Sequence, residues 1–177
     1  MVVKDEARDF EPIPAGVQPA VCVAIHDLGT QEGFKGKPQH KLAIVWELEE
    51  RRNEGDFAGQ RFIVTKTYTS SLNERSNLSK DLESWAGKTF TADQRENGFD
   101  LKVFLNRTCN LNLVEKTSSS NRVYANVAGI TGLHKGQQKM KPENPGYVPK
   151  WIEQLTNGDD KLPSSDDFDD DIPFNNA

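Results

Sequence analysis

Hydrophobic and polar residues alternate along much of the first half of the chain, with the period of two that is typical of β-strands. One segment with this period begins at Val17 and runs toward Thr30, and in it larger apolar residues alternate with the small residues Ala20, Cys22 and Ala24. A second spans residues 41 to 49, and a third, rich in β-branched and aromatic residues, spans residues 61 to 69. These patterns predict three consecutive strands.

The period then changes to that of a helix. Ser76 or Asn77 can cap its start, and Gly87 can end it in the left-handed conformation. The apolar residues that share one face of this helix are Leu78, Leu82 and Trp85. The pattern therefore predicts one amphipathic helix, with Trp85 in the core.

Alternation resumes from Leu101 to Leu113, which predicts a long fourth strand, and again at residues 122 to 130, which predicts a fifth. The predicted order is strand, strand, strand, helix, strand, strand. This is the order of the OB-fold, a small barrel whose second and third strands and flanking loops bind oligonucleotides or oligosaccharides. Other α+β folds with five strands and one covering helix stay open as alternatives.

Composition adds a tail to this picture. The 177-residue chain has a mean hydropathy of −0.70 and 35% hydrophobic residues, which is low for a chain packed throughout. Its net charge is −5, yet residues 151 to 177 hold eight acidic residues and one lysine, whereas residues 12 to 150 are mildly basic. Such asymmetry is typical of polyanion binding or of a tail that binds basic partners. The predicted fold class is mainly β, a five-stranded OB-fold barrel followed by a disordered acidic C-terminal tail.

The predicted organisation has four parts. Residues 1 to 14 are an N-terminal extension, residues 15 to 134 the nucleic-acid-binding domain, residues 135 to 158 a linker with a short helix, and residues 159 to 177 the acidic tail. No apolar run is long enough for a secretory signal or a membrane span, so neither export nor membrane binding is expected.

Enzyme motifs and metal sites are not expected. Residues 86 to 90 contain a Gly-Lys-Thr sequence, but Leu82 stands where a phosphate-binding P-loop needs glycine. Cys22 and Cys109 lie far apart, outside any Cys-x-x-Cys pair, and the three histidines are scattered. The C-terminal aspartates lack the glycine and the glutamate of a calcium loop. The sequence therefore predicts a non-enzymatic protein without metal or other cofactor.

Basic and aromatic residues are interleaved in the loop between the first two strands, residues 31 to 41, and on one face of the third strand. Lysines bind phosphates, and an exposed ring that stacks on a base contributes about 1 to 3 kcal/mol. A lysine at position 66, within an apolar and aromatic face, is unusual in a core and fits a groove for nucleic acid. The alternatives are a solvated hairpin and, for Tyr124, packing in place of stacking. The predicted DNA-binding residues are Phe34, Lys35, Lys37, His40, Lys41, Arg61, Phe62, Lys66, Tyr68, Arg75, Lys116, Arg122 and Tyr124.

The segment DFDDDIPF, residues 167 to 174, resembles the acidic C-terminal tip of bacterial single-stranded DNA-binding proteins residue for residue. The resemblance implies an OB domain that coats single strands and a tip that recruits replication, recombination and repair proteins. The implied partner-binding residues are Asp167, Phe168, Asp169, Asp170, Asp171, Ile172, Pro173 and Phe174. In that family the final phenylalanine carries the terminal carboxylate, whereas residues 175 to 177 follow it here.

Residues 69 to 91 are similar to small phage replication-module proteins, so the expected location is the cytoplasm of a bacterial cell or of a phage-infected host. The functional hypothesis is that the protein binds and protects single-stranded DNA with little sequence preference and recruits partner enzymes. One alternative is an RNA-binding OB-fold protein, which would recognise the 2′-hydroxyl. The other is a protein-interaction adaptor whose tail alone engages replication factors. The sequence leaves a homo-oligomer open.

Overall fold

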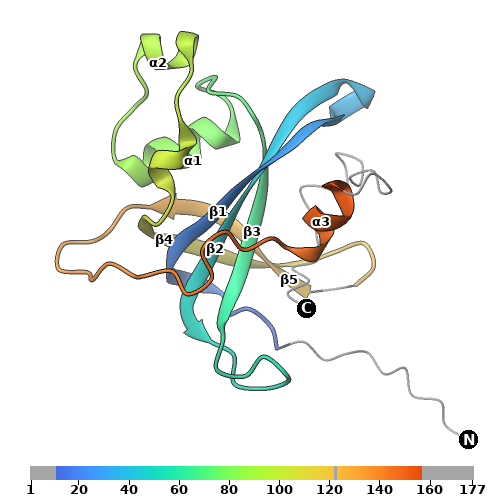
Figure 1. The fold of residues 1–177 in the computed structure, drawn as a ribbon, viewed down its shortest axis with the longest axis vertical. Coiled ribbons are helices and arrows are strands. Elements are labelled where there is room, and N and C mark those ends of the chain that lie inside the picture. The colour runs from blue at the N-terminus through green and yellow to red at the C-terminus, as the bar shows by residue number, and fades with distance from the viewer. Residues whose placement is uncertain (1–10, 122, 157–177) are drawn as a thin grey trace, which may run out of the picture.

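The computed structural model describes residues 11 to 121 and 123 to 156, and the architecture is mainly β (Figure 1). The strands are β1 (Gly16–Glu32), β2 (Pro38–Arg51), β3 (Arg61–Thr69), β4 (Thr108–Thr117) and β5 (Val123–Thr131). The helices are α1 (Asn77–Ala86), α2 (Ala92–Asn97) and α3 (Lys150–Thr156), and two 3-10 turns are η1 (Phe34–Gly36) and η2 (Leu101–Phe104). The predicted order of five strands with a helix after the third is confirmed, and η1, α2 and η2 are additions to it.

β1 is the central strand of a five-stranded antiparallel sheet with the order β3-β2-β1-β4-β5. Its first part pairs with β4, from Gly16 opposite Leu113 to Val21 opposite Thr108. From Ala20 onward it pairs with β2. Two register shifts interrupt the β1–β2 ladder, and such bulges bend a strand. β1 therefore crosses from one half of the sheet to the other, as Figure 1 shows.

β3 and β5 are the two edges of this sheet. Within the described residues, no ladder of backbone hydrogen bonds joins the two strands, so the sheet is open. The architecture therefore agrees with the expected fold class as a mainly β, five-stranded antiparallel sheet with α1 between β3 and β4. The expected closure into a barrel is not seen in this part of the chain.

The main core lies on the inner face of the sheet. Alternating residues of β2 and β3 point into this core and are buried: Leu42, Ile44, Trp46, Leu48, Phe62, Val64 and Tyr68. α1 covers the face with its apolar side and lies against both β3 and β5. Trp85 of α1 in turn packs on Phe104 of η2, with 4.7 Å between their ring centroids. The helix thus covers the core between the two edge strands.

α1 begins and ends where the sequence predicts. The Ser76 hydroxyl accepts a hydrogen bond from the backbone N–H of Ser79 at 3.1 Å, which satisfies a donor of the first turn. Gly87 has a φ of 72°, in the left-handed region, and its N–H donates to the carbonyl of Glu83 at 2.9 Å. Both predicted ends of the helix are therefore confirmed.

The predicted fourth strand is wrong in its first part. Leu101 and Phe104 belong to η2, where residues three apart share a face and both contact the core. Asp100 caps this turn by accepting the N–H of Lys102 at 3.0 Å. Asn106 then has a φ of 64°, outside the β region and unfavourable for a non-glycine residue in a strand. β4 begins only at Thr108, after this break.

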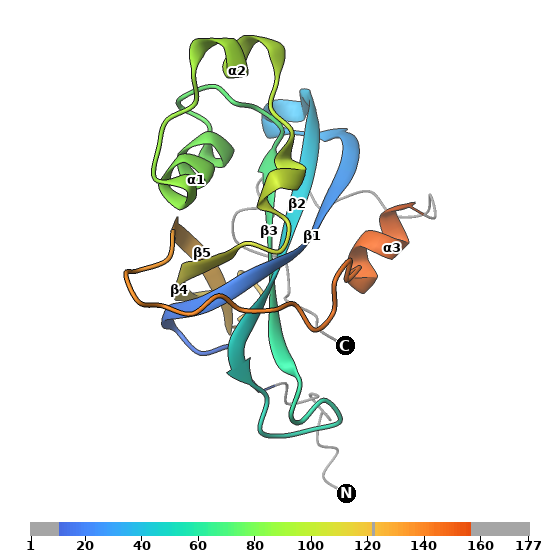
Figure 2. The same cartoon turned by 60° about the vertical axis from the view of Figure 1, so that its left-hand side comes forward.

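The chain after β5 returns across the outer face of β1, β2 and β3 (Figure 2). Residues 140 to 147, which we call the strap, place Met140 and Tyr147 against that face. The residues beneath them are Val21, Val23, Ala24, Val45 and Ile63. α3 packs beside the strap on Leu28 and Ala43. Much of the segment expected to be a linker with a short helix therefore covers the sheet, and both faces of β2 are buried.

Several predicted features lie outside the described residues. They are residues 1 to 10 of the N-terminal extension, Arg122, and the tail from residue 159 with all predicted partner-binding residues, 167 to 174. Among the helices that the structure describes, none is long and apolar enough to cross a membrane.

Candidate nucleic-acid interface

The apolar and aromatic face of β3 belongs to the main core. Phe62 is 1% exposed and Tyr68 is 3% exposed. A ring buried to this extent cannot stack on a base in this conformation. The expectation that this face of β3 lines an open groove is therefore corrected, because it is the inner face of the sheet.

Lys66, on the same face, is held in a network with α1 and β5. Its Nζ donates to Asp81 Oδ2 and to the Val127 carbonyl, both at 2.9 Å. The Tyr68 hydroxyl donates to the same Asp81 oxygen at 2.7 Å. Burial, followed by the charge of Asp81, raises the pKa of Tyr68 well above its ordinary value, so the hydroxyl remains a donor. This network satisfies the lysine inside the protein, which removes the reason for placing it in a groove.

The β1–β2 loop exposes two of its predicted lysines. The N–H of Gly33 donates to the Lys37 carbonyl at 2.7 Å, and Lys35 takes up a left-handed φ of 56° within η1. The end of the Gln39 side chain occupies the space where a Cβ on Gly33 would stand, so a larger residue at position 33 would displace that side chain. Lys35 and Lys37 are therefore displayed on a tight turn, whereas the side chain of Phe34 lies outside the described part.

Two other predicted residues of this loop are engaged within the protein. His40 Nε2 lies 2.6 Å from Asp27 Oδ1 across the β1–β2 hairpin. Lys41 is 9% exposed, and its Nζ donates to Thr69 Oγ1 at 2.8 Å. Lys41 is therefore a structural residue here, while His40 stays exposed beside a carboxylate.

The remaining predicted cations and Tyr124 lie in separate places. Arg75 is exposed in the loop after β3, on the side of the sheet where β2 begins, because Thr69 pairs with Lys41. Lys116 and Tyr124 stand opposite each other in the β4–β5 ladder, and both are half-buried. Three of the predicted DNA-binding residues are therefore exposed at one end of β2 and β3, namely Lys35, Lys37 and Arg75.

Arg61 is anchored beneath the strap. Its Nη1 donates to Glu47 Oε2 at 3.2 Å and to the Lys141 carbonyl at 2.7 Å. Glu47 is fully buried and also accepts the backbone N–H groups of Glu143, at 2.9 Å, and Asn144. A buried carboxylate on β2 therefore ties the strap to the sheet, and Arg61 serves that attachment.

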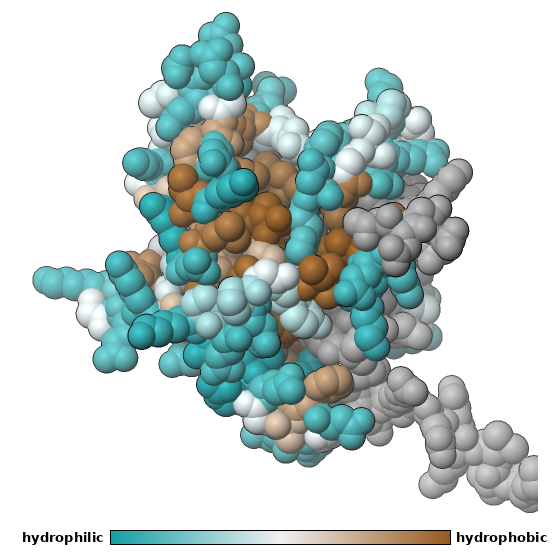
Figure 3. All heavy atoms as spheres, viewed as in Figure 1, coloured by the Kyte–Doolittle hydropathy of each residue, from teal (hydrophilic) through white to brown (hydrophobic). Residues whose placement is uncertain are grey.

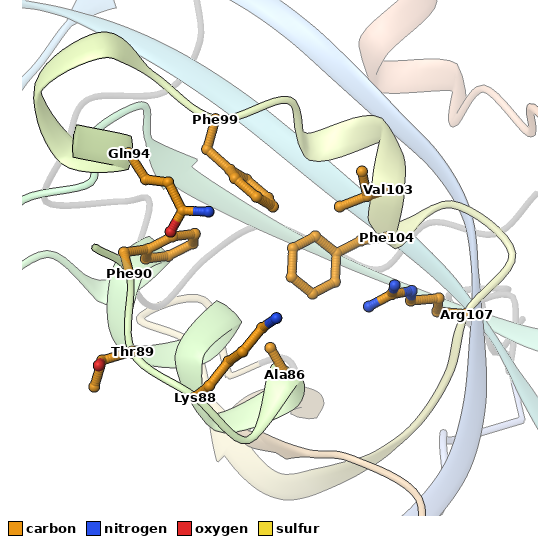
Figure 4. Close-up of a pocket in the computed structure, with 9 residues that line it drawn as sticks. All are labelled: Ala86, Lys88, Thr89, Phe90, Gln94, Phe99, Val103, Phe104 and Arg107. Carbon is orange, nitrogen blue, oxygen red and sulfur yellow. The ribbon is translucent and has the colours of Figure 1, made fainter. Parts of the chain in front are cut away.

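A pocket that the sequence did not indicate lies between the end of α1, α2 and η2 (Figure 4). Its volume is about 190 Å³, and its apolar walls are Phe90, Phe99, Val103 and Phe104. Lys88, Gln94 and Arg107 stand around these walls. Figure 3 shows hydrophobic surface gathered on the side of the molecule that carries α1 and α2. The prediction of a long fourth strand missed this pocket. In a strand, Leu101 and Phe104 would lie on opposite faces, whereas in η2 they share one face.

The cysteines and histidines form no site for chemistry. Cys22 and Cys109 are both fully buried and unbridged. Burial raises the pKa of the Cys22 thiol to about 12 and raises that of Cys109 well above its ordinary value. Among the described residues, no group of three His, Cys, Asp or Glu side chains could hold a metal ion.

Comparison of the chain with models of known protein families, with curated protein sequences and with solved structures gave no match. Function is therefore inferred from the strand order, the displayed side chains and the tail sequence.

Proposed function

We propose that the protein binds single-stranded DNA without catalysing a reaction, and that its domain is an OB-fold left open between β3 and β5. The strand order with α1 between β3 and β4 supports this proposal, because it is the order of OB-folds, which are partly open barrels. The tip sequence at residues 167 to 174 supports it independently of the fold.

The observation that carries the proposal is the display of Lys35 and Lys37 on the β1–β2 loop. This loop contacts the ligand in OB-folds, and lysines there meet phosphates without reading bases. Arg75 extends the basic surface from the neighbouring loop after β3. The strap covers the outer face of β2 and β3, so the strand of DNA runs along these loops.

The tail has a separate task in this proposal. Its aspartates steer the chain toward basic surfaces of replication, recombination and repair proteins, and Ile172, Pro173 and Phe174 fill an apolar site on them. Domain and tail thus bind different partners at once.

Fluorescence anisotropy with three matched oligonucleotides tests the proposal. A dT-rich single strand of DNA is expected to bind most tightly, with a log–log salt slope of about −0.7 for each phosphate neutralised. Duplex DNA is expected to bind more weakly, because its stacked bases and stiffness fit the loops poorly. Equal affinity for duplex DNA contradicts the proposal. Tighter binding of the matched RNA would show instead that RNA is the preferred ligand.

Charge reversal locates the surface. Lys35→Glu with Lys37→Glu is expected to weaken single-strand binding and to reduce the salt slope by about 0.7 for each lysine removed. Lys80→Glu on α1 changes the net charge by the same amount per residue at another exposed place, and it serves as the control. An equal loss in the control would show a general charge effect, not a site.

A protein-interaction adaptor is the second candidate, and the burial of Phe62 and Tyr68 favours it. Without those rings, β3 offers no stacking platform on the face that the sequence had indicated. The adaptor predicts no anisotropy change with any of the three oligonucleotides, while the tail still binds replication factors.

A further inference from the structure

The pocket between α1, α2 and η2 has an apolar interior that no other described segment fills. The rings of Phe90 and Phe99 meet edge to face with 5.1 Å between centroids, and Phe99 lies 6.2 Å from Phe104. Val103, at the pocket wall, is 45% exposed. A hollow of this composition on the surface suits an apolar side chain from another segment.

Hydrogen-bond donors surround this interior. Gln94 Oε1 accepts the N–H of Thr91 at 2.9 Å, so the amide nitrogen is the end that faces the pocket in Figure 4. Lys88 Nζ and the Arg107 guanidinium point toward it as well, the latter 5.6 Å from the centre of the Phe104 ring. The nine described residues that line the pocket include no Asp or Glu. The site therefore suits a ligand that combines acceptors with apolar groups.

We infer that this pocket holds the acidic end of the same chain, residues 167 to 174. The segment sets carboxylates beside Phe168, Ile172 and Phe174, so it supplies acceptors for the three donors and a side chain for the hollow. A nucleobase fits less well because bases present donors as well as acceptors, and the hydroxyl of Thr89 points away from the pocket in Figure 4. The inference stands on the pocket and the tail composition and does not require that the protein bind nucleic acid.

The chain is long enough for this contact. Ile172 lies sixteen positions after Thr156, the last residue of α3, and this length of chain spans about 50 Å when extended. A domain of this size has a radius of gyration of about 15 Å, so the tail reaches most of its surface. Tethering also gives the segment an effective concentration in the millimolar range. A tip held in this pocket is withheld from other proteins until one of them displaces it.

Disulfide trapping in the full-length chain tests the contact. Val103→Cys places a thiol at the pocket wall, and Asn175→Cys places one beside Phe174 while leaving every anchor of the tip in place. The matched control pairs Asn175→Cys with Val114→Cys on β4, because Val114 is 41% exposed, close to the 45% of Val103. Cys22 and Cys109 are fully buried and do not compete. Oxidised glutathione supplies the oxidising equivalents, and non-reducing gels with mass spectrometry report the bond.

The pocket pair, Val103→Cys with Asn175→Cys, is expected to form an intramolecular disulfide about tenfold faster at low salt than the β4 pair, Val114→Cys with Asn175→Cys. This difference in rate is expected to shrink at high salt. Equal rates for the two pairs overturn the inference. So does a disulfide between two chains at the pocket, which would assign it to the tail of a second copy.

Charge reversal at the rim gives a second readout. When Lys88→Glu and Arg107→Glu are added to the protein with the pocket pair of cysteines, the faster disulfide formation is expected to be abolished. Adding Lys80→Glu is expected to leave it unchanged. An advantage that survives reversal of both rim charges overturns the inference. A third outcome also overturns the inference. If the two cysteine pairs form disulfides at equal rates and a dT oligomer protects the Val103→Cys thiol from alkylation, the pocket binds nucleic acid and not the tail.

Discussion

The carboxylate of Glu47, fully buried on β2, accepts a hydrogen bond from the backbone N–H of Glu143 at 2.9 Å. This bond joins the middle of the sheet to the strap, and Arg61 completes the charge balance at 3.2 Å from the same carboxylate. The strap is therefore held on the outer face of the sheet by hydrogen bonds to one buried carboxylate as well as by apolar contacts.

Glu47→Gln is expected to lower the free energy of unfolding by about 1 to 3 kcal/mol. One carboxylate oxygen is replaced by an NH₂ group, which cannot accept hydrogen bonds from the surrounding N–H donors. Urea unfolding followed by tryptophan fluorescence measures the change. Glu49→Gln, two residues along β2 and exposed, is the control and should shift stability little. A Glu47→Gln protein as stable as wild type would show that the strap is held by its apolar residues alone.

Lys66→Met is expected to lower stability by about 1 to 3 kcal/mol while leaving single-strand affinity unchanged in the folded protein. The substitution leaves the Val127 carbonyl without this donor and Asp81 without its cation. Unfolding and anisotropy measured on the same sample distinguish this outcome from the sequence-based interpretation. A loss of affinity in a protein of unchanged stability would restore Lys66 as a DNA contact.

The native thiols are expected to be inert to a disulfide reagent at pH 8. With the pKa of Cys22 raised to about 12, about one thiol in 10⁴ is ionised at that pH, and burial blocks access as well. Both cysteines are expected to react once the protein is unfolded in guanidinium. The Val103→Cys variant, with its exposed thiol, is the positive control, and fast reaction of the native thiols in wild type would contradict their burial.

Acid is expected to weaken the attachment of the strap. The hydrogen bond from Arg51, and then the charge of Arg61, lower the pKa of Glu143 below 4.5. A lowered folded-state pKa means that this carboxylate stabilises the protein above about pH 4.5 and that its contribution is lost as pH falls through the folded-state value. The side chain is 40% exposed, so the contribution is at most about 1 kcal/mol.

Unfolding of wild type and Glu143→Gln at several pH values measures this contribution. The difference in stability between the two proteins should be constant from pH 7 to 5 and should vanish below the folded-state pKa. A difference that persists in acid would assign the effect of the substitution to packing.

Removal of the negative charge of the tail is expected to strengthen single-strand binding at low salt. Asparagine at positions 166, 167 and 169 to 171 keeps the length of the tail while removing its competition for basic groups. The gain in affinity should disappear at high salt, where salt screens the charges of both the wild type and the variant. Anisotropy titrations at two salt concentrations measure it, and unchanged affinity at low salt would argue against competition.

The sequence predicted the strands and α1 well because their signals are local. Ser76 and Gly87 cap the helix by hydrogen bonds within one turn, and the alternation on β2 matches the side of the sheet on which Leu42, Ile44 and Trp46 enter the main core. Trp85 also lies in the core, as its helical spacing predicts. Each of these features depends on residues no more than a few positions apart.

The candidate site was predicted less well because its residues pair over long sequence distances. Lys66 is explained by Asp81, which lies on the apolar face of α1 between Leu78 and Trp85, so an acidic residue on that face was an available signal. Glu47 gave no local signal, since its partners are backbone groups about a hundred residues later. The pairing of such residues depends on the return of the chain across the sheet, which periodicity does not describe.

The two ladders of β1 also set an order of events during synthesis. β2 follows β1 directly and can pair with it as a hairpin, whereas β4, the partner of Gly16 to Val21, leaves the ribosome much later. Until then that part of β1 is an uncovered strand edge beside an unfinished core, and nascent chains cut short before β4 are open to pairing with one another. In the complete sheet β4 covers this edge of β1, and β5 in turn pairs with β4.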